Sequence, residues 1–330
     1  MKSKIKQIII SFFKNPLVFL KLHWYTLYVM KTRKYRDWVL NSPQKAIDIV
    51  WYVTYQKNFP WDNPETLNEK ITWLSGKTDT TKWTECSDKY EVRNYIKGIG
   101  LEEILTKCYG VWDDVDEIDF DKLPKSFVLK CTHDCGSTIL VKDKDTINVE
   151  EVKTFLRDHL KYKMGYDTCE PHYARIKPRI MAEELLDDSG SGLFESKSIV
   201  DYKLWCINGV LQWGFICYDR HLDSQGEDPN GHSTVFDLYD VRNWKPIRQY
   251  LSEEYKHVTF KDVPCPKNLE GMIQIAERIA KGFPQVRVDL YNLNGKIYFG
   301  EMTFTSQGGR MSYYTDEFQK IMGKKILLLP

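Results

Sequence analysis

The sequence predicts an α+β protein built from amphipathic helices and antiparallel β-hairpins. Apolar residues recur at helical spacing in several stretches, among them 147–166 and 268–283. Two other stretches, 200–219 and 286–304, are rich in β-branched and aromatic residues, and an Asn-Gly pair interrupts each of them. Asn-Gly is typical of a tight hairpin turn, and a tight turn joins antiparallel strands.

The composition is that of a globular protein. The 330 residues are 42% hydrophobic and 28% charged, enough for one large multi-lobed enzyme or two ordinary domains. A formal net charge of only +1 argues against a general nucleic-acid binder, which needs a basic surface. The eight cysteines follow no secretory signal peptide and form no disulfide framework, so we expect reduced thiols in the cytoplasm.

Positive charge is concentrated at the N-terminus. Residues 1–50 contain ten Lys or Arg against two Asp, a net charge of +8, and the rest of the chain carries −7. Within this segment the apolar stretch 8–20 is interrupted by Lys14 and Pro16 and is too short to span a membrane. Two interpretations stay open for residues 1–36: a helix that contacts an anionic membrane at its surface, or a helix that packs on the protein's own body.

The following segments predict helices that lead into the body of the protein. Ser42-Pro43 is a helix-opening signal, and the helical pattern after it meets a Pro-rich break at 60–64. Residues 87–100 place apolar side chains at helical spacing and end on glycines, with Lys89 on another face.

Two β-rich runs after residue 111 enclose a short polar loop. The loop runs from His133 to Ser137. Cys131 and Cys135 lie four residues apart with His133 between them, a spacing that suggests a metal ion. No second Cys/His pair at zinc-like spacing follows, so we do not expect zinc.

The second hairpin carries the most informative polar residues. Arg287 and Asp289 are two apart on its first strand, Glu301 and Thr303 are two apart on its return strand, and each pair shares a face. An Arg and two carboxylates on a buried face need partners, because unpaired buried charge is strongly unfavourable. Mg²⁺ on Asp289 and Glu301, with a phosphate bound by Arg287, would supply them. The simpler alternative is an exposed Arg–Glu pair on a solvated sheet face.

This hairpin resembles the metal-binding hairpin of the ATP-grasp superfamily, whose pattern is Arg-x-Asp, a turn, and then Glu-x-Asn. The resemblance implies that Asp289, Glu301 and Thr303 are the Mg²⁺ ligands. Thr303 stands where the superfamily has Asn; a hydroxyl can coordinate Mg²⁺ directly or through water, but it is a poorer ligand than a carboxamide oxygen.

Two further segments resemble parts of the superfamily's phosphate site. In 127–141, Lys130 ends a strand, and Gly136 and Ser137 follow in a loop similar to the glycine-rich flap that covers the phosphates. The strand around Lys203 resembles the strand that supplies another cation. The resemblance therefore implies that Lys130 and Lys203 bind ATP and that both, with the arginine of the hairpin, stabilise the charge that shifts during phosphoryl transfer.

The strand 179–186 resembles the superfamily's hinge strand, which contacts the adenine edge through backbone groups. By this resemblance Glu183, Glu184 and Leu185 bind the nucleotide. From about residue 63 to the C-terminus, the order and spacing of these motifs are similar to the TupA-like branch, associated with teichuronopeptide biosynthesis. The flap departs from that branch, since THDCGS stands where NHGSGG is typical.

The resemblance implies an ATP-grasp fold, two α+β lobes that clasp ATP, with four parts. These are a basic helical extension (1–62), an N-terminal lobe and approach to the catalytic body (63–125), a small nucleotide-binding lobe with the flap (126–185), and a C-terminal lobe with the metal site (186–330). The N-terminal lobe is short for an ATP-grasp ligase, which suggests that acceptor binding is simplified or shared with a partner.

The activity that the resemblance implies is an ATP- and Mg²⁺-dependent ligation of a carboxylate to an amine through an acylphosphate, in cell-envelope or capsular polysaccharide biosynthesis. The substrates would be small molecules or glycans, such as a uronic acid joined to an amino acid or amino sugar. A glycosyltransferase is one alternative, although no Asp-x-Asp motif stands at a suitable strand end, and the run from Asp113 to Asp116 lies in an acidic loop. A non-catalytic scaffold with a drifted ATP site is another, because Thr303 and the flap depart from the pattern.

Overall fold

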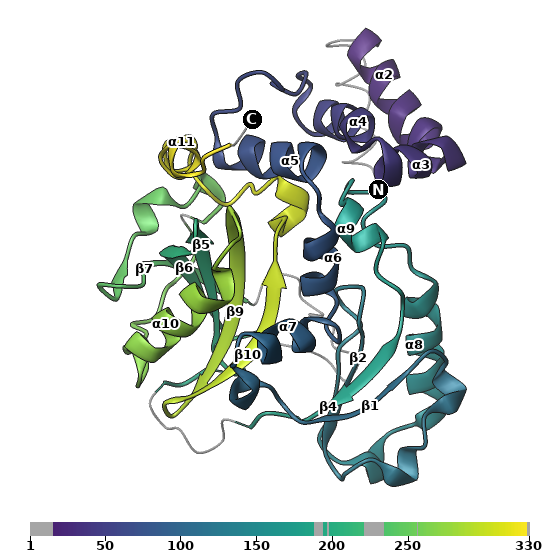
Figure 1. Cartoon of the computed structure of the whole chain (residues 1–330), viewed down its shortest axis with the longest axis vertical. Helices are drawn as coiled ribbons and strands as arrows, with labels where there is room; N and C mark the ends of the chain where they lie inside the picture. Colours follow the sequence, from purple (N-terminus) through teal and green to yellow (C-terminus); the bar gives the residue numbers. More distant parts are fainter. Residues whose placement is uncertain (1–15, 188–193, 197, 221–233, 256, 329–330) are drawn as a thin grey trace.

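The computed structural model describes residues 16–187, 194–196, 198–220, 234–255 and 257–328. Two antiparallel sheets form two lobes, with α6 and α7 between them, and a group of helices lies at one corner of the molecule (Figure 1). The first fifteen residues of the proposed membrane-contacting segment and most of the Gly/Ser-rich loop before Ser196 fall outside the described residues.

The described part of the N-terminal extension is mostly helical up to Tyr55. It contains α2 (Pro16–Leu27), α3 (Arg33–Asn41) and α4 (Pro43–Tyr55). The Thr32 hydroxyl caps α3 by accepting a hydrogen bond from a backbone N–H of its first turn, and the proline that opens α4 lacks the N–H that would be unpaired there. The three helices enclose a small core that includes Tyr35, Val39, Ile47, Val50, Trp51 and Phe59. None of the described helices is long and apolar enough to cross a bilayer.

Three helices connect this extension to the lobes: α5 (Leu67–Lys77), α6 (Thr81–Ser87) and α7 (Val92–Gly98). A capping box fixes the start of α5, because Thr66 and Glu69 each accept a backbone N–H of the other. The buried side chains of α5, α6 and α7 join the same core as the large sheet. They therefore belong to the large lobe and not to a separate N-terminal lobe.

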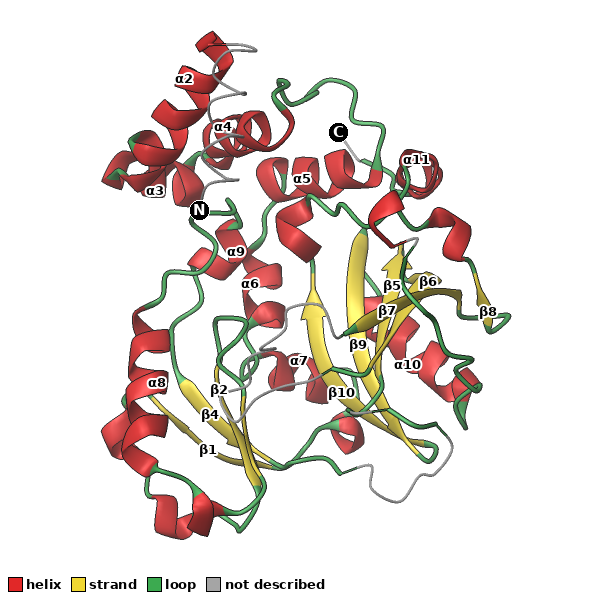
Figure 2. Cartoon of the chain, turned by 180° about the vertical axis from the view of Figure 1, so that it is seen from behind, coloured by secondary structure: helices red, strands yellow, loops and turns green. Residues whose placement is uncertain are grey.

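The small lobe has a four-stranded antiparallel sheet in the order β1-β4-β2-β3. Its strands are β1 (Cys108–Trp112), β2 (Phe127–Cys131), β3 (Ile139–Val141) and β4 (Ile180–Glu183). Helix α8 (Val149–Lys161), capped by the Asn148 side chain, covers this sheet, and the short α9 (Pro171–Ala174) follows it (Figure 2). Since β1 pairs with β4, this lobe begins before residue 126, and the predicted unit 63–125 is divided between the two lobes.

The large lobe has a six-stranded antiparallel sheet in the order β10-β9-β5-β6-β7-β8. Its strands are β5 (Asp201–Ile207), β6 (Val210–Tyr218), β7 (Val235–Asp240), β8 (Lys245–Pro246), β9 (Gln285–Leu293) and β10 (Lys296–Thr303). Helix α10 (Leu269–Ala280) packs on it, and α11 (Asp316–Lys325) packs on α5 (Figure 2).

Both predicted hairpins are present in the large sheet. Asn208 and Gly209 turn β5 into β6, and Asn294 and Gly295 turn β9 into β10. All four residues have positive φ, between 51° and 97°, the conformation that a two-residue hairpin turn needs. The α+β architecture predicted from the sequence is therefore confirmed.

Candidate active site

Charged side chains from three neighbouring strands meet on one face of the large sheet. Lys203 on β5 and Glu301 on β10 both lie opposite Asp289 on β9, the strand between them. The Lys203 Nζ is 2.5 Å from Asp289 Oδ2. Arg287 donates from Nε to Asp289 Oδ1 at 2.6 Å and from Nη2 to Glu301 Oε1 at 2.8 Å. Lys203, Arg287 and Asp289 are only 7%, 9% and 2% exposed, so the alternative of a solvated surface pair is wrong.

A β-bulge sets the register of the return strand. Opposite β9 the pairing shifts between Phe299 and Glu301, which leaves Gly300 as the extra residue. A Cβ atom at this position would lie 3.0 Å from the Asp289 carbonyl oxygen, so a glycine suits the close approach of the two strands. After the bulge, Glu301 stands opposite Asp289, and Thr303 Oγ1 lies 3.3 Å from Glu301 Oε1.

The cluster gives its two carboxyl groups different pKa values. Burial raises the pKa of Asp289 to about 6, against the opposing effect of Arg287 and Lys203. Partial removal from water would raise the pKa of Glu301, but Arg287, Lys203 and Lys89 together lower it to about 2. Both groups are therefore ionised at neutral pH, as metal ligands must be.

The donor set fits Mg²⁺. Asp289, Glu301 and Thr303 present only oxygen atoms, the ligands that this ion prefers. Glu301 is the accessible member, since its side chain is 42% exposed and only Oε1 is hydrogen-bonded among the described residues. Asp289 is held by two cations, so it would bind a metal while sharing its charge with Lys203 and Arg287.

The other predicted lysine lies in the small lobe. Lys130 on β2 forms an ion pair with Glu183 on β4, which also accepts a hydrogen bond from Thr106 Oγ1 at 2.9 Å. Glu184 is turned towards Lys107, whose backbone N–H donates to the Glu184 carboxylate at 3.3 Å. The small sheet thus brings Lys130 and Glu183 together, whereas the Glu184 side chain is directed to the Lys107 backbone and not to Lys130.

The flap loop is held by its own side chains. Ser137 Oγ accepts the Cys131 N–H at 2.8 Å and donates to Asp134 Oδ1 at 2.5 Å, and Gly136 has a φ of 98°. Ser137 as a whole residue is 1% exposed, whereas Gly136 beside it is exposed, so a nucleotide would contact this loop at Gly136. Cys131, His133 and Asp134 place possible ligand atoms within 4.8 Å of one another, but Asp134 is already bound by Ser137.

Lys89 links the flap to the metal hairpin, and the sequence did not reveal this role. Its backbone N–H donates to Thr132 O at 3.1 Å, and its amine donates to the Asp134 carbonyl. Its charge also lowers the pKa of Glu301 in the opposite lobe. Lys89 therefore lies between the two lobes, where phosphates would be bound by flap and hairpin together.

Two other residues of the cluster were missed. Asp201 Oδ2 is 2.6 Å from Lys203 Nζ, and Ser306 Oγ accepts a hydrogen bond from Arg287 Nη1 at 3.0 Å. The signal for Asp201 was present, because it precedes Lys203 by two residues on a strand and so shares its face. Ser306 follows the strand β10, and only the fold brings it to Arg287.

Two lobes with facing antiparallel sheets, a lysine in each, and a hairpin with paired carboxylates define an ATP-grasp protein. The chain belongs to the TupA-like ATP-grasp family, whose sequence model matches residues 69–327. Family and fold as predicted from the sequence are thereby confirmed.

Solved structures of ligases show remote similarity. L-amino acid ligase from Bacillus licheniformis is 15% identical, with a TM-score of 0.47 over 87% of this chain and 62% of that protein. D-alanine–D-alanine ligase from Bacillus anthracis is 14% identical, with a TM-score of 0.40 over 78% of this chain and 65% of that protein. This chain thus matches less than two thirds of the length of either ligase. Proteins with curated descriptions gave no match.

Proposed function

We propose that this protein is an ATP-dependent carboxylate–amine ligase. The observation that carries the proposal is the buried cluster of Lys203, Arg287 and Asp289 beside the accessible Glu301, in a chain of the ATP-grasp family. Well-packed apolar residues often stabilise a fold as much as a buried ion pair does. Stability alone therefore gives little reason for a charged cluster at this position. Phosphate binding needs the cations of this cluster, and metal binding needs its carboxylates.

The proposed reaction has two steps. A substrate carboxylate oxygen attacks the γ-phosphorus of ATP, the bond from that phosphorus to the bridging oxygen breaks, and ADP leaves. The amine nitrogen then attacks the carbonyl carbon of the acylphosphate, phosphate departs with the bonding electron pair, and the nitrogen loses a proton to give the amide. No group of the protein needs to act as a nucleophile.

The side chains supply charge and position in both steps. Lys130 and Lys203 stabilise charge on the ATP phosphates, and Arg287 stabilises the transferred phosphoryl group. Mg²⁺ bound by Asp289, Glu301 and Thr303 would neutralise phosphate charge. The backbone at Glu183, Glu184 and Leu185 would contact the adenine, and the flap loop that contains Gly136 and Ser137 would cover the phosphates.

We place the reaction in the assembly of a cell-envelope or capsular polysaccharide, at the cytoplasmic side of the membrane, because of the family to which the chain belongs. The carboxylate would come from a uronic acid and the amine from an amino acid or an amino sugar.

An ADP-release screen of uronic acids against amino acids and amino sugars tests the activity. Turnover that needs one carboxylate and one amine together, and that is lost in Glu301→Gln, supports the ligase. Hydrolysis of UDP-sugars without ATP would indicate the glycosyltransferase, and ATP binding with no turnover for any pair would indicate a scaffold. The matched control is Glu277→Gln, because Glu277 is a carboxylate on α10 that pairs with Arg242, outside the candidate active site.

We also propose that α2 contacts an anionic membrane surface. One face of α2 packs on the protein, where the Tyr25 ring lies edge-on to Tyr52 of α4 at 6.0 Å and Lys21 Nζ lies 3.8 Å from the centre of the Tyr52 ring. Another face of α2 carries large apolar side chains that are each at least 50% exposed, Leu17, Leu20, Trp24 and Leu27, and the equally exposed Tyr28 follows directly after the helix.

The charge beside these exposed side chains favours a lipid surface as their partner. Residues 16–41 contain five Lys or Arg and a single Asp. Apolar and aromatic side chains that enter the headgroup layer, flanked by cations, are typical of interfacial helices. On this proposal, one face of α2 packs on the protein and the other would contact lipid.

A further inference from the structure

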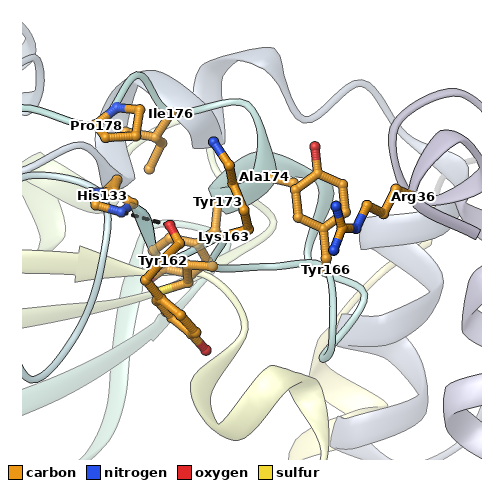
Figure 3. Close-up of a pocket in the computed structure, with 10 residues that line it drawn as sticks. Arg36, His133, Tyr162, Lys163, Tyr166, Tyr173, Ala174, Ile176 and Pro178 are labelled. Atoms are coloured by element: carbon orange, nitrogen blue, oxygen red, sulfur yellow. Dashed lines mark hydrogen bonds between the residues drawn. The ribbon is translucent and has the colours of Figure 1, made fainter. Parts of the chain in front are cut away.

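A small cavity lies between the N-terminal extension and the flap. It has a volume of about 130 Å³ and is lined by residues of four separate segments. In Figure 3, His133, Ile176 and Pro178 lie on one side of it, Tyr166 and Arg36 lie on the opposite side, and Lys163 and Tyr173 lie between them. At 10–15 Å³ for each water position, the space holds on the order of ten waters, or a ligand of similar size.

Two exposed cations without an anionic partner among the described residues line the cavity. In the described part of the chain, the side chains of Arg36 and Lys163 form no ion pair and no hydrogen bond. The Arg36 Cζ lies 5.8 Å from the centre of the Tyr166 ring. By contrast, Lys130 and Lys203 in the candidate active site are both paired with carboxylates. Two unpaired cations at one cavity favour an anionic ligand, and a carboxylate matches the planar fork of an arginine.

The cavity shares a wall with the candidate active site. Tyr173 lines the cavity, and burial raises the pKa of its phenol, with a further rise from the nearby Glu301 and Glu170. His133 lines it as well and begins the flap, where its Nε2 donates to the Tyr162 carbonyl at 3.1 Å. A ligand in the cavity would therefore lie next to both parts of the site that the proposed reaction uses.

We infer that this cavity binds the amine donor, and that the donor is an amino acid with a free carboxylate and not an amino sugar. The inference rests on the proposed ligase function. Arg36 and Lys163 hold the carboxylate that does not react, and the amine end of the molecule lies towards Tyr173. The amine nitrogen is then free to attack the acylphosphate carbonyl carbon, with phosphate as the leaving group.

The cavity also gives the N-terminal extension a function. Arg36 comes from α3 of the extension, whereas the other lining residues come from the segments 133, 162–166 and 173–178 of the small lobe. The helices of the extension would thus complete the amine-binding site in a protein whose N-terminal lobe is short. A neutral or cationic amino sugar would bring no anion to the two cations, and its binding would leave them unpaired.

Calorimetry on the full chain tests this inference without turnover. The probes are L-serine, L-lysine and L-glutamate, each compared with its α-amide and with glucosamine, in the presence of Mg²⁺ and a non-hydrolysable ATP analogue. We expect at least one free amino acid to bind, with its α-amide and glucosamine roughly ten- to hundredfold weaker, the range for losing a charge-assisted contact. Arg36→Met and Lys163→Met should each weaken the binding of that amino acid by a similar factor.

Two matched controls lie close by. Arg33 is on the same helix, and Lys161 ends the helix before Lys163, but neither lines the cavity. Arg33→Met and Lys161→Met should leave amino-acid binding unchanged, and all four variants should unfold at the wild-type urea concentration because these side chains are exposed. ATP affinity should stay at the wild-type value in all of them.

The inference fails if no free amino acid binds, if α-amides or glucosamine bind as tightly as the free acids, or if Arg36→Met and Lys163→Met bind like the wild type. The proposed function fails separately. If amino acids bind as expected but no carboxylate partner gives ADP release, the cavity stands and the ligase does not. If ADP release occurs equally with amino sugars, the ligase stands and the assignment of the cavity is overturned.

Discussion

Lys203 and Asp289 form a buried ion pair across β5 and β9, with 2.5 Å between Nζ and Oδ2. Arg287 donates to the same carboxylate, so Asp289 is the shared anion of two buried cations. Glu301 is more exposed and has only Arg287 as an ion-pair partner in the described chain. The two proposed metal ligands should therefore respond differently to substitution.

Neutralising Glu301 should affect turnover more than stability. We expect Glu301→Gln to abolish Mg²⁺-dependent ADP release and to lower the free energy of unfolding at neutral pH, by less than Asp289→Asn does because Glu301 is more exposed. Asp289→Asn should also abolish ADP release and in addition destabilise the fold by about 3–5 kcal/mol, the range for leaving buried charges unpaired. Urea unfolding, circular dichroism and ADP release measure both effects. Turnover near that of the wild type in both variants would remove the hairpin from the active site.

The two lysines should contribute to ATP binding. We expect Lys130→Met and Lys203→Met each to weaken ATP binding by about 1–3 kcal/mol, the range for losing a charge-assisted hydrogen bond. Lys203→Met should also lower stability, since it leaves Asp201 and Asp289 without their shared cation. Calorimetry with ATP gives the affinity. Lys177→Met, at an exposed lysine paired with Asp113, is the control, and unchanged affinity in both test variants would contradict the assignment.

Replacing Thr303 by Asn should be tolerated. Asn is the residue that the superfamily pattern has at this position, and a carboxamide oxygen is a better Mg²⁺ ligand than a hydroxyl. We expect Thr303→Asn to keep its activity and to need the same or a lower Mg²⁺ concentration for half-maximal ADP release. A loss of activity at saturating Mg²⁺, in a variant that folds, would show that the threonine serves another purpose, such as placing the acceptor.

The low pKa of Glu301 predicts a specific dependence of stability on pH. Its folded-state pKa of about 2 lies below the ordinary value of 4.5, so its stabilising effect is complete above the ordinary value and is lost as the pH falls towards 2. The difference in unfolding free energy between wild type and Glu301→Gln should be constant above about pH 6 and should change progressively below about pH 4.5. Urea unfolding at several pH values measures it, and a difference independent of pH would be inconsistent with this charge environment.

The exposed face of α2 should direct the protein to anionic vesicles. We expect the wild type to sediment with vesicles that contain anionic lipid, not with neutral ones, and to be released at about 1 M salt, where the Debye length falls to about 3 Å. Leu20→Gln and Trp24→Gln should weaken sedimentation but leave ATP binding intact. Val210→Gln, at an exposed valine in the β5–β6 hairpin, should bind vesicles like the wild type. Equal sedimentation of all variants, or none with any vesicle, would reject the proposal.

The sequence by itself determined the local elements of this protein. The turns at Asn208-Gly209 and Asn294-Gly295 depend on backbone conformations that these residues adopt by themselves, so both hairpins were predictable. Period-two spacing placed Arg287 with Asp289 on one face, and the motif order indicated the ATP-grasp fold. Each of these signals lies within a few residues of chain.

Only the tertiary structure decided how distant residues meet. Strand order put Lys203 opposite Asp289, and lobe packing put Lys89 within electrostatic reach of Glu301. Sheet pairing joined β1 to the small lobe and so divided residues 63–125, which the sequence had assigned to one unit. Local spacing carries no information about these contacts, because they depend on which strands pair and which faces are covered.

The same limit applies to the exposure of side chains. The sequence offered Ser137 as a phosphate contact, but the fold turns its hydroxyl inward to hold the flap. It also left open whether the N-terminal segment meets a membrane or the protein, and packing on α4 covers one face of α2 and leaves the Leu20 and Trp24 face exposed. A residue's type sets what chemistry it can perform, whereas the surrounding fold determines whether water, a partner side chain or a ligand reaches it.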